Sequence, residues 1–433
     1  MLKPALTPSK VFVPGGMPVI TYVPRAEREL EERLRSVQDN LCKLVTLTGS
    51  TKSGKTVLAN RIFPRSSGDS IWIDGGSIDS EETFWREIHA QIDIDEEIDV
   101  ESTDNSSTTT SGKVGVQGAL PFILKGKAEG GLSREDGFAR ARKTQPVQGI
   151  RARAIRMLRD SGRPLIVDDF HYIDRKSQGS IVRALKPLVF EGHAVVFIAI
   201  PHRRYDVVRV EKEMTGRVLS IPVPSWTGDE LLQIASSGFP KLGMDIPTKV
   251  SKGLASEAYG SPHLMQEFCR EVAKDRLDNN ELKSDSPAQF EGKKLFKRSA
   301  EATGKIIFDK LAKGPRQRTD RMQRPLVGGG TADIYRVILL ALSHISPGLN
   351  VIDYELLRNG IRSILTDNIP QANEVTRVLE KMAEIASKDE SSVAVIDWDA
   401  DEQKLHITDP FFAFFLKWSE EYIRSQPLNE LKA

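Results

Sequence analysis

The stretch "GSTKSGKT" at residues 49–56 has the residue types and the spacing of a phosphate-binding loop. The pattern G-x-x-x-x-G-K-[ST] is met by Gly49, Gly54, Lys55 and Thr56. The glycines let backbone N–H groups turn toward phosphate oxygens, the lysine reaches the β- and γ-phosphates, and the hydroxyl ligates Mg²⁺. We therefore predict nucleotide contacts along the whole loop: Gly49, Ser50, Thr51, Lys52, Ser53, Gly54, Lys55 and Thr56.

The segments on either side of this loop strengthen the prediction. The run "KLVTLT" before it is short and rich in β-branched and apolar residues, which is typical of a buried strand. The segment "TVLANRIF", which ends at Pro64, predicts the helix that follows. A helix that begins at the loop adds the positive end of its dipole to the phosphate site. The alternative, a glycine-rich turn without a ligand, does not explain this order.

A second motif, "RPLIVDDFHYID" at 163–174, supplies acidic side chains after another apolar run. We predict that Asp168 holds Mg²⁺, directly or through water. Asp169 stands where many ATPases carry a glutamate that orients the attacking water, and we predict a catalytic role for it. Because aspartate is one methylene shorter than glutamate, we expect slow turnover. The alternative is a solvated acidic turn.

A third segment that could bear on catalysis follows the predicted strand "AVVFIAI" at 194–200. In P-loop enzymes the residue after this strand often senses the γ-phosphate. Within "PHRRYD", Arg203 is our candidate catalytic residue, with Arg204 and His202 as alternatives.

Five apolar runs must position these side chains: "LVTLT", "IWID", "LIVDD", "VVFIAI" and "VLSIPV". Predicted helices lie between them, so we expect an α/β fold with a mainly parallel sheet. Residues 101–145 are rich in Ser, Thr and Gly and low in apolar residues, and we interpret them as an insertion in this core. The insertion is either a flexible segment or a partner contact.

The remaining chain divides by composition. We expect an extended Pro-rich segment at 1–24, the P-loop core at 25–226, a helical lid at 227–280 and a linker at 281–330. Thr227 and Glu230 have the spacing of a capping box that begins the lid. The linker carries basic residues that either meet phosphate from a neighbouring subunit or stay solvated or paired within the chain: Arg316, Arg318, Arg321 and Arg324.

Residues 331–433 predict a separate winged-helix domain. "DIYRVILLALSHI", "YELLRNGIRSIL" and "NEVTRVLEKMAEIA" have the apolar periodicity of amphipathic helices, and "SVAVIDWDADEQKLHIT" alternates like a hairpin. We expect "DPFFAFFLKW" to form a closing helix whose aromatic side chains lie in the core.

Composition excludes several classes of protein. The 433 residues carry 61 Lys plus Arg against 60 Asp plus Glu, a net charge of +1, so no global field draws the chain to nucleic acid or membrane. Its apolar runs are far shorter than the roughly 20 residues of a membrane span. The two cysteines suggest neither a disulfide framework nor a zinc site. We expect a cytoplasmic protein.

Taken together, "GSTKSGKT", "LIVDDFHYID", Gly-Ser-Pro at 260–262, the winged helix and "DPFFAFFLKW" resemble the STAND and archaeal-type ATPases. These belong to the wider AAA+ relatives, which include origin-recognition initiators. The resemblance covers about 20–100 and 146–425.

The resemblance implies a switch that binds ATP and Mg²⁺ between core and lid, closes with the winged helix and assembles into a homo-oligomer when it opens. It implies that Pro262 and His263 line the nucleotide, and that Arg25 marks the segment framing the adenine. It also implies a separately encoded effector or trigger protein, because no sensor repeat or effector domain is recognisable.

Two other functions stay open beside a regulatory ATPase switch in defence or signalling. One is a DNA-binding initiator- or loader-like ATPase, which the winged helix suggests. Against it, the helix "NEVTRVLEKMAEIASK" mixes acidic with basic residues and the wing "DWDADEQ" is acidic, whereas phosphate-facing elements should be basic. The other is a scaffold that binds nucleotide without turnover.

Overall fold

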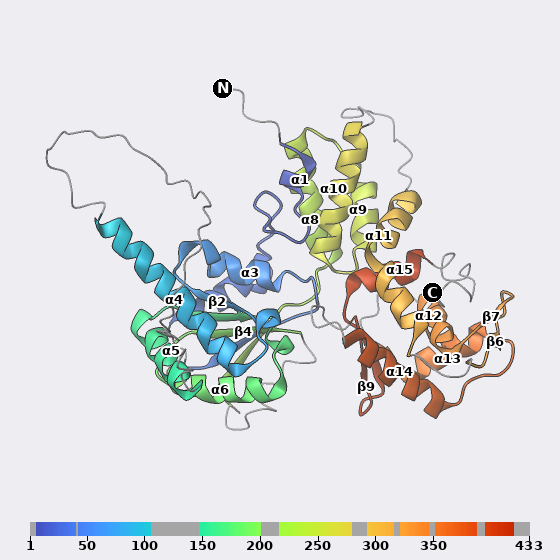
Figure 1. Cartoon of the computed structure of the whole chain (residues 1–433). Helices are drawn as coiled ribbons and strands as arrows, with labels where there is room; N and C mark the ends of the chain where they lie inside the picture. The colour runs from blue at the N-terminus through green and yellow to red at the C-terminus, as the bar shows by residue number, and fades with distance from the viewer. Residues whose placement is uncertain are drawn as a thin grey trace, which may run out of the picture.

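A five-stranded parallel sheet forms the centre of the N-terminal half of the computed structural model (Figure 1). Its strands lie in the order β2-β3-β4-β1-β5. The bounds are β1 Leu44–Thr48, β2 Ile71–Asp74, β3 Leu165–Asp168, β4 Val195–Ala199 and β5 Val218–Pro222. The structure describes residues 6–39, 42–104, 147–200, 216–278, 292–315, 321–345, 351–387 and 395–419.

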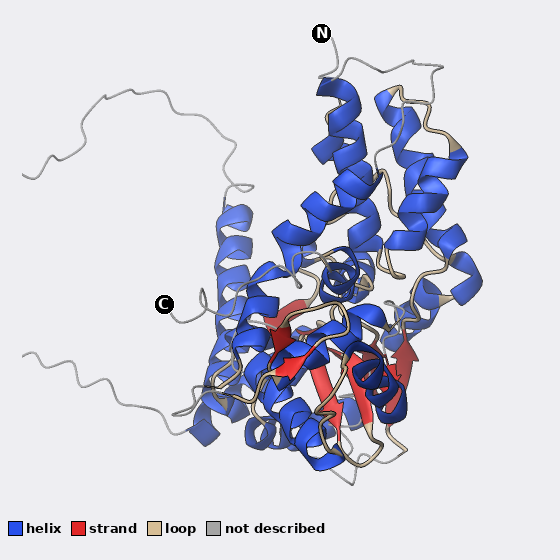
Figure 2. Ribbon diagram, turned by 90° about the vertical axis from the view of Figure 1, so that its right-hand side faces the viewer, coloured by secondary structure: helices blue, strands red, loops and turns tan. Residues whose placement is uncertain are grey.

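Helices cover both faces of this sheet, because its strands are apolar on both sides. One face packs against α4 (Glu81–Asp104), α5 (Val147–Ser161) and α6 (Arg175–Phe190). The other face packs against α2 (Leu30–Arg35) and α3 (Lys55–Ile62). Within β3, Leu165 and Val167 join the first cluster and Ile166 the second, as the two-residue period of a strand requires. Figure 2 shows the sheet between these helices.

The predicted α/β class, parallel pairing and five strands are confirmed. One boundary differs from expectation. The segment "SEETFWREIHAQI" predicts a helix over 80–92, but α4 continues to Asp104, into the start of the predicted insertion. The chain from 81 to 104 contains neither glycine nor proline, so nothing in the sequence breaks the helix earlier. The rest of the insertion, from 105 to 145, lies outside the described residues.

The lid contains α8 (Gly228–Gly238), α9 (Thr248–Glu257) and α10 (Pro262–Asp278). The capping box predicted for Thr227 and Glu230 is confirmed at the start of α8. A short 3₁₀ segment, Phe239–Leu242, follows α8 in the lid. Two others, Ala26–Arg28 and Ser36–Gln38, lie on either side of α2 before β1.

The C-terminal part follows the linker helix α11 (Gly292–Lys313). Helices α12 (Ile334–His344), α13 (Tyr354–Ile364) and α14 (Ala372–Ser387) accompany an antiparallel sheet in the order β8-β10-β9. Its strands are β8 Val351–Asp353, β9 Ile396–Asp399 and β10 Lys404–Ile407. A small hairpin, β6 Arg324–Pro325 with β7 Thr331–Ala332, precedes α12, and α15 (Pro410–Trp418) closes the chain. These are the elements expected of a winged helix, and that assignment stays a prediction.

The lid, the linker helix and the C-terminal part share one continuous hydrophobic cluster. The aromatic side chains of α15 lie in it as predicted, with Phe414 packed against Phe268 of α10 and Phe415 against Phe308 of α11. Gly304 of α11 lies so close to α15 that an added Cβ would lie 2.3 Å from Cβ and 2.5 Å from Cγ of Phe415. The sheet domain has two clusters of its own. The lid and C-terminal part therefore form one packed unit beside the sheet domain.

The N-terminal segment also belongs to the lid. The short helix α1 (Pro8–Val11) interrupts the segment that we expected to be extended, and it packs against α10. Phe12 is fully buried against Phe239. Thr21 and the backbone N–H of Val13 both hydrogen-bond Gln266. In the described part of the chain, no helix is both long and apolar enough to cross a membrane.

Candidate functional site

The predicted phosphate-binding loop connects the end of β1 to the first turn of α3. Gly54 has φ +91°, a left-handed conformation that glycine adopts without strain. At Gly49 an added Cβ would lie 2.6 Å from the carbonyl oxygen of Val223, so no larger residue fits there. The two glycines of the motif are thus required by backbone geometry. Lys52 also has a left-handed backbone conformation, with φ +61°. This conformation is strained for a residue other than glycine, and such strained residues cluster at functional sites.

Lys55 is buried in this loop. Its ammonium donates hydrogen bonds to the carbonyl oxygens of Gly49 and Ser50, both at 2.9 Å. Burial lowers the pKa of Lys55 to about 8, while the nearby Asp169 and Asp168 oppose that shift. The side chain therefore stays mostly charged at neutral pH, and it lies where a phosphate bound by the loop would meet it.

Asp168, at the end of β3, reaches across to the loop. Its Oδ1 accepts a hydrogen bond from the Thr56 hydroxyl at 3.2 Å. This pair brings together the hydroxyl and the carboxylate that would hold Mg²⁺. Burial raises the pKa of Asp168, and the Thr56 hydrogen bond and the charge of Arg65 oppose that shift. A neighbouring cation would favour the charged form further.

Asp169 lies beside Asp168 with φ +50°, again in the left-handed region. Burial, and then the charge of Asp168, raises the pKa of Asp169 to about 6. A carboxylate with a pKa near neutrality suits a general base that orients or deprotonates water. Gly75, in the turn after β2, packs directly against the backbone of Asp169. An added Cβ at Gly75 would lie 2.4 Å from the carbonyl oxygen of Asp169, so no larger residue fits there.

Two observations show that the loop fits a nucleotide phosphate. Its helix begins at Lys55, so free N–H groups and the positive helix end face the loop. Ser53 is 2% exposed, and the hydroxyls of Ser53 and Thr51 are buried without a hydrogen-bond partner among the described residues. Thr56 and Asp168, which lie within hydrogen-bond distance of each other, would be the protein ligands of Mg²⁺, which usually keeps several waters.

Sequence reasoning missed Arg65, which lies just beyond α3. Its guanidinium donates to Oδ2 of Asp168 at 3.3 Å. It also stacks over the ring of Trp72 in β2, with 4.4 Å between the guanidinium carbon and the ring centroid. No local signal in "FPRSSGDS" could have found this residue, because both contacts come from strands elsewhere in the chain.

The structure brings Pro262 and His263 to the loop. A Cβ added to Gly54 would lie 3.9 Å from Cγ of Pro262. Ser261, just before it, donates a 3.4 Å hydrogen bond to the carbonyl of Lys52. Burial and the charge of Lys52 lower the pKa of His263 to about 4, so its imidazole is neutral. Contact of Pro262 and His263 with a nucleotide stays a prediction.

Arg25 lies one layer further out, where it joins the core to the lid. It is 7% exposed and pairs with both oxygens of Glu230 at 3.0 and 3.2 Å. It also donates to the carbonyl of Pro224 and stacks over Trp226. Trp226 in turn donates from its indole to the carbonyl of Ser53 at 2.9 Å. Arg25 thus reaches the loop through Trp226, and its predicted place beside adenine stays untested.

The start of α15 reaches the same region from the C-terminal part. The rings of Phe411 and His263 meet edge to face, with centroids 4.9 Å apart. Asp409 caps α15 by accepting the N–H of Phe411 at 2.7 Å. Burial raises the pKa of Asp409, and the N–H of Phe411 and the charge of Lys52 oppose that shift. In the sheet domain, burial raises the pKa of Tyr172, and the charges of Asp169, Asp74 and Asp409 add to that shift. No local sequence pattern predicts this contact. The remaining candidate, Arg203, lies outside the described residues.

Comparison with known proteins bears on the fold. No protein-family profile and no curated protein matches the chain. The Walker-type ATPase of Pyrococcus abyssi superposes with a TM-score of 0.52 at 14% identity, over 96% of this chain and 99% of that one. The ADP form of the ORC2 protein of Aeropyrum pernix gives 0.48 at 13% identity, over 96% and 97%. Cdc6p of Pyrobaculum aerophilum gives 0.45 at 12% identity, over 96% and 99%.

The structural similarity to the Pyrococcus abyssi protein extends over nearly the whole of both chains. Because the two sequences are only 14% identical, this similarity is evidence for a shared fold alone. Together with the parallel sheet, it shows that the chain has an α/β P-loop ATPase fold.

Proposed function

We propose that this chain binds ATP with Mg²⁺, hydrolyses it slowly, and passes the nucleotide state to its lid and C-terminal part as a switch of the STAND or AAA+ kind. In this proposal Lys55 and the loop N–H groups bind the phosphates. Thr56 and Asp168 hold Mg²⁺, which would neutralise phosphate charge. Asp169 orients water, and its short side chain favours slow turnover. Arg203 would add a cation at the γ-phosphate.

One observation supports the switch most strongly: the contact of Phe411 with His263 beside the loop. His263 lies in the first turn of α10 in the lid, and Phe411 lies in the first turn of α15 in the C-terminal part. Because the lid and C-terminal part share one core, a shift of the lid at the nucleotide moves both together. The joint with the sheet domain includes polar contacts of Trp226, Ser261 and Arg25, and such contacts can break without exposing a core.

The switch controls assembly in this proposal. Opening would expose surface that a second copy, or a separately encoded trigger or effector protein, can bind. The experiment is multi-angle light scattering with small-angle X-ray scattering on the full chain, in ATP, in ADP and without nucleotide. We expect ATP to change the radius of gyration or the mass of the wild type, and Lys55→Ala to abolish that change. Lys43→Ala, an exposed lysine before β1, is the matched control.

Phe411→Ala tests the coupling itself. We expect it to leave ATP affinity within about twofold and to weaken the ATP-dependent change in dimensions, because the C-terminal part then loses its ring contact with His263 beside the loop. Phe190→Ala, on an exposed ring of α6, should leave the dimensions unchanged. The coupling proposal fails if Phe411→Ala and Phe190→Ala behave alike.

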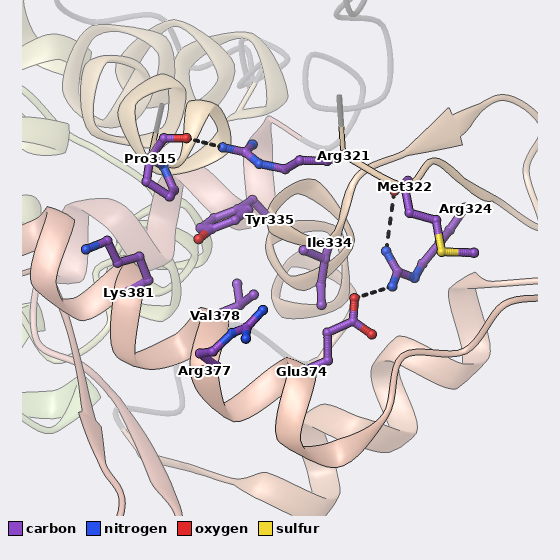
Figure 3. Close-up of a pocket in the computed structure, with 10 residues that line it drawn as sticks. All are labelled: Pro315, Arg321, Met322, Arg324, Ile334, Tyr335, Glu374, Arg377, Val378 and Lys381. Carbon is purple, nitrogen blue, oxygen red and sulfur yellow. Dashed lines mark hydrogen bonds and ion pairs between the residues drawn. The ribbon is translucent and has the colours of Figure 1, made fainter. Parts of the chain in front are cut away.

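A second candidate function is DNA binding by the C-terminal part, as in an initiator-like ATPase. A pocket of about 500 Å³ beside α14 favours it, because four cationic side chains line it (Figure 3): Arg321, Arg324, Arg377 and Lys381. DNA backbones are recognised by such groups.

Most of these charges are already paired within the chain. Arg321 pairs with Asp333 at 2.7 Å, Arg324 pairs with Glu374, and Lys381 pairs with Glu384. The intramolecular alternative for the linker arginines thus holds for Arg321 and Arg324, while Arg316 and Arg318 lie outside the described residues.

The DNA alternative is tested by anisotropy of a labelled duplex at 50 and 200 mM salt. Binding that weakens at least tenfold at the higher salt, and further in Arg377→Glu, would favour it. Equal signals with and without protein would leave the switch as the function.

A further inference from the structure

We propose that Arg65 is a positioning residue for the Mg²⁺ site, which holds the Asp168 carboxylate so that Oδ1 faces Thr56. This inference rests on the proposed binding of Mg²⁺ with ATP at the loop. It concerns a residue that lies outside both predicted motifs and touches one of their acids.

The two oxygens of Asp168 have separate partners. Oδ1 accepts from the Thr56 hydroxyl at 3.2 Å and from the N–H of Asp169 at 3.1 Å. Oδ2 accepts from Arg65 at 3.3 Å. The carboxylate therefore cannot rotate about its Cβ–Cγ bond without losing contacts at both oxygens. Its free rotation would otherwise present either oxygen to a metal at Thr56.

Arg65 is itself fixed on its other side. Its guanidinium stacks on Trp72, whose indole N–H is anchored by the carbonyl of Phe63 at 2.9 Å. Its backbone N–H donates to the side chain of Asn60 at 3.0 Å. The ring of Trp72 is 7% exposed, so it forms a rigid wall. Arg65 is thus clamped between a buried ring and the carboxylate that it orients.

Two effects of Arg65 on Mg²⁺ oppose each other. Its positive charge repels the ion, whereas its hydrogen bond orders the ligand. The guanidinium is 50% exposed and lies on the Oδ2 side, while Thr56 lies on the Oδ1 side. Solvent screens the repulsion, whereas the ordering acts through direct contact. Partners of metal ligands typically contribute 10- to 100-fold to metal affinity, and the half-exposed position places Arg65 at the lower end.

The test is equilibrium binding of a fluorescent ATP analogue to the full chain during a titration with Mg²⁺. We expect Arg65→Ala to raise the Mg²⁺ concentration needed for half-maximal enhancement of binding by about 10-fold. Affinity measured without Mg²⁺ should stay within about twofold of wild type. Arg65→Lys, which keeps a donor toward Oδ2, should restore part of the loss.

Arg61→Ala is the matched control, because Arg61 lies on α3 and stacks on Tyr22 instead. An unchanged Mg²⁺ requirement in Arg65→Ala, or a loss equal to that of Arg61→Ala, overturns the inference. A lower Mg²⁺ requirement also overturns it, because Arg65 would then compete with the ion. Failure of the wild type to bind the analogue refutes the proposed function instead, so the two failures are distinguishable.

Discussion

Replacing Asp169 with asparagine removes a carboxylate whose charged form is destabilised in the folded protein by burial and by the charge of Asp168. Its pKa rises from 3.8 to about 6 because the carboxyl is buried and lies beside Asp168. The native state therefore binds a proton more tightly than the unfolded state does. Between about pH 4 and pH 6 native stability falls as pH rises, and above that window the full penalty is present.

The size of the penalty follows from the shift. One pKa unit corresponds to about 1.36 kcal/mol, so a shift to about 6 gives roughly 3 kcal/mol above pH 7. The side chain is only partly buried, and solvent screening reduces this to about 1–2 kcal/mol. We expect Asp169→Asn to stabilise the protein by that amount at pH 7.5, by about half as much at pH 5, and by almost nothing at pH 4.

Thermal unfolding by calorimetry at pH 7.5 and pH 5 measures this difference. For a domain the size of the sheet domain, the gain corresponds to a rise of roughly 2 to 6 °C in Tm at pH 7.5. The same variant should bind ATP and lose hydrolysis, because an amide cannot accept a proton from water. Asp160→Asn, on the exposed end of α5, should change neither quantity.

A destabilised Asp169→Asn variant at pH 7.5, or a gain that does not shrink toward pH 5, would refute the reasoning about the buried charge. Unchanged turnover would remove Asp169 from the mechanism without affecting the electrostatic argument. The two readouts therefore test separate steps.

Three further predictions concern the close contacts of Gly75 and Gly304 and the helix cap at Asp174. Gly75→Ala should displace Asp169 and lower ATP hydrolysis at least 10-fold while destabilising the core by about 1–3 kcal/mol, and full turnover in steady-state kinetics would contradict the 2.4 Å approach. Gly304→Ala should force α11 away from Phe415 and lower the Tm of the lid and C-terminal unit; an unchanged calorimetric trace would show that this contact yields without strain. Asp174 caps α6 through the N–H groups of Lys176 and Ser177, so its replacement by alanine should lower the free energy of unfolding by about 1 kcal/mol in urea titrations, and no change in the midpoint would count against the cap.

Local sequence patterns predicted the parts of the fold that local interactions determine. The five strands lie within or close to their predicted runs, because each is a short apolar segment bounded by polar residues. The loop glycines and the capping box at Thr227 and Glu230 were found for the same reason, since each depends on residues within a few positions.

Contacts between distant segments could not be predicted in this way. Arg65 contacts Asp168, which lies 103 positions away in the sequence, and Phe411 contacts His263, which lies 148 positions away (411 − 263). The sequence predicts a polar linker between the lid and the C-terminal part. In the structure, α11 and α15 pack these two parts into one hydrophobic core. Only the three-dimensional arrangement decides which apolar faces cover each other.

Binding of ATP by the loop is the claim on which the account depends most directly. The measurement is isothermal titration calorimetry of ATP into the wild type, Lys55→Ala and Lys43→Ala, each with and without Mg²⁺. The account predicts binding by the wild type and by Lys43→Ala that tightens with Mg²⁺, and at least a 100-fold loss in Lys55→Ala. Retention of wild-type affinity in Lys55→Ala would contradict the assignment of the site.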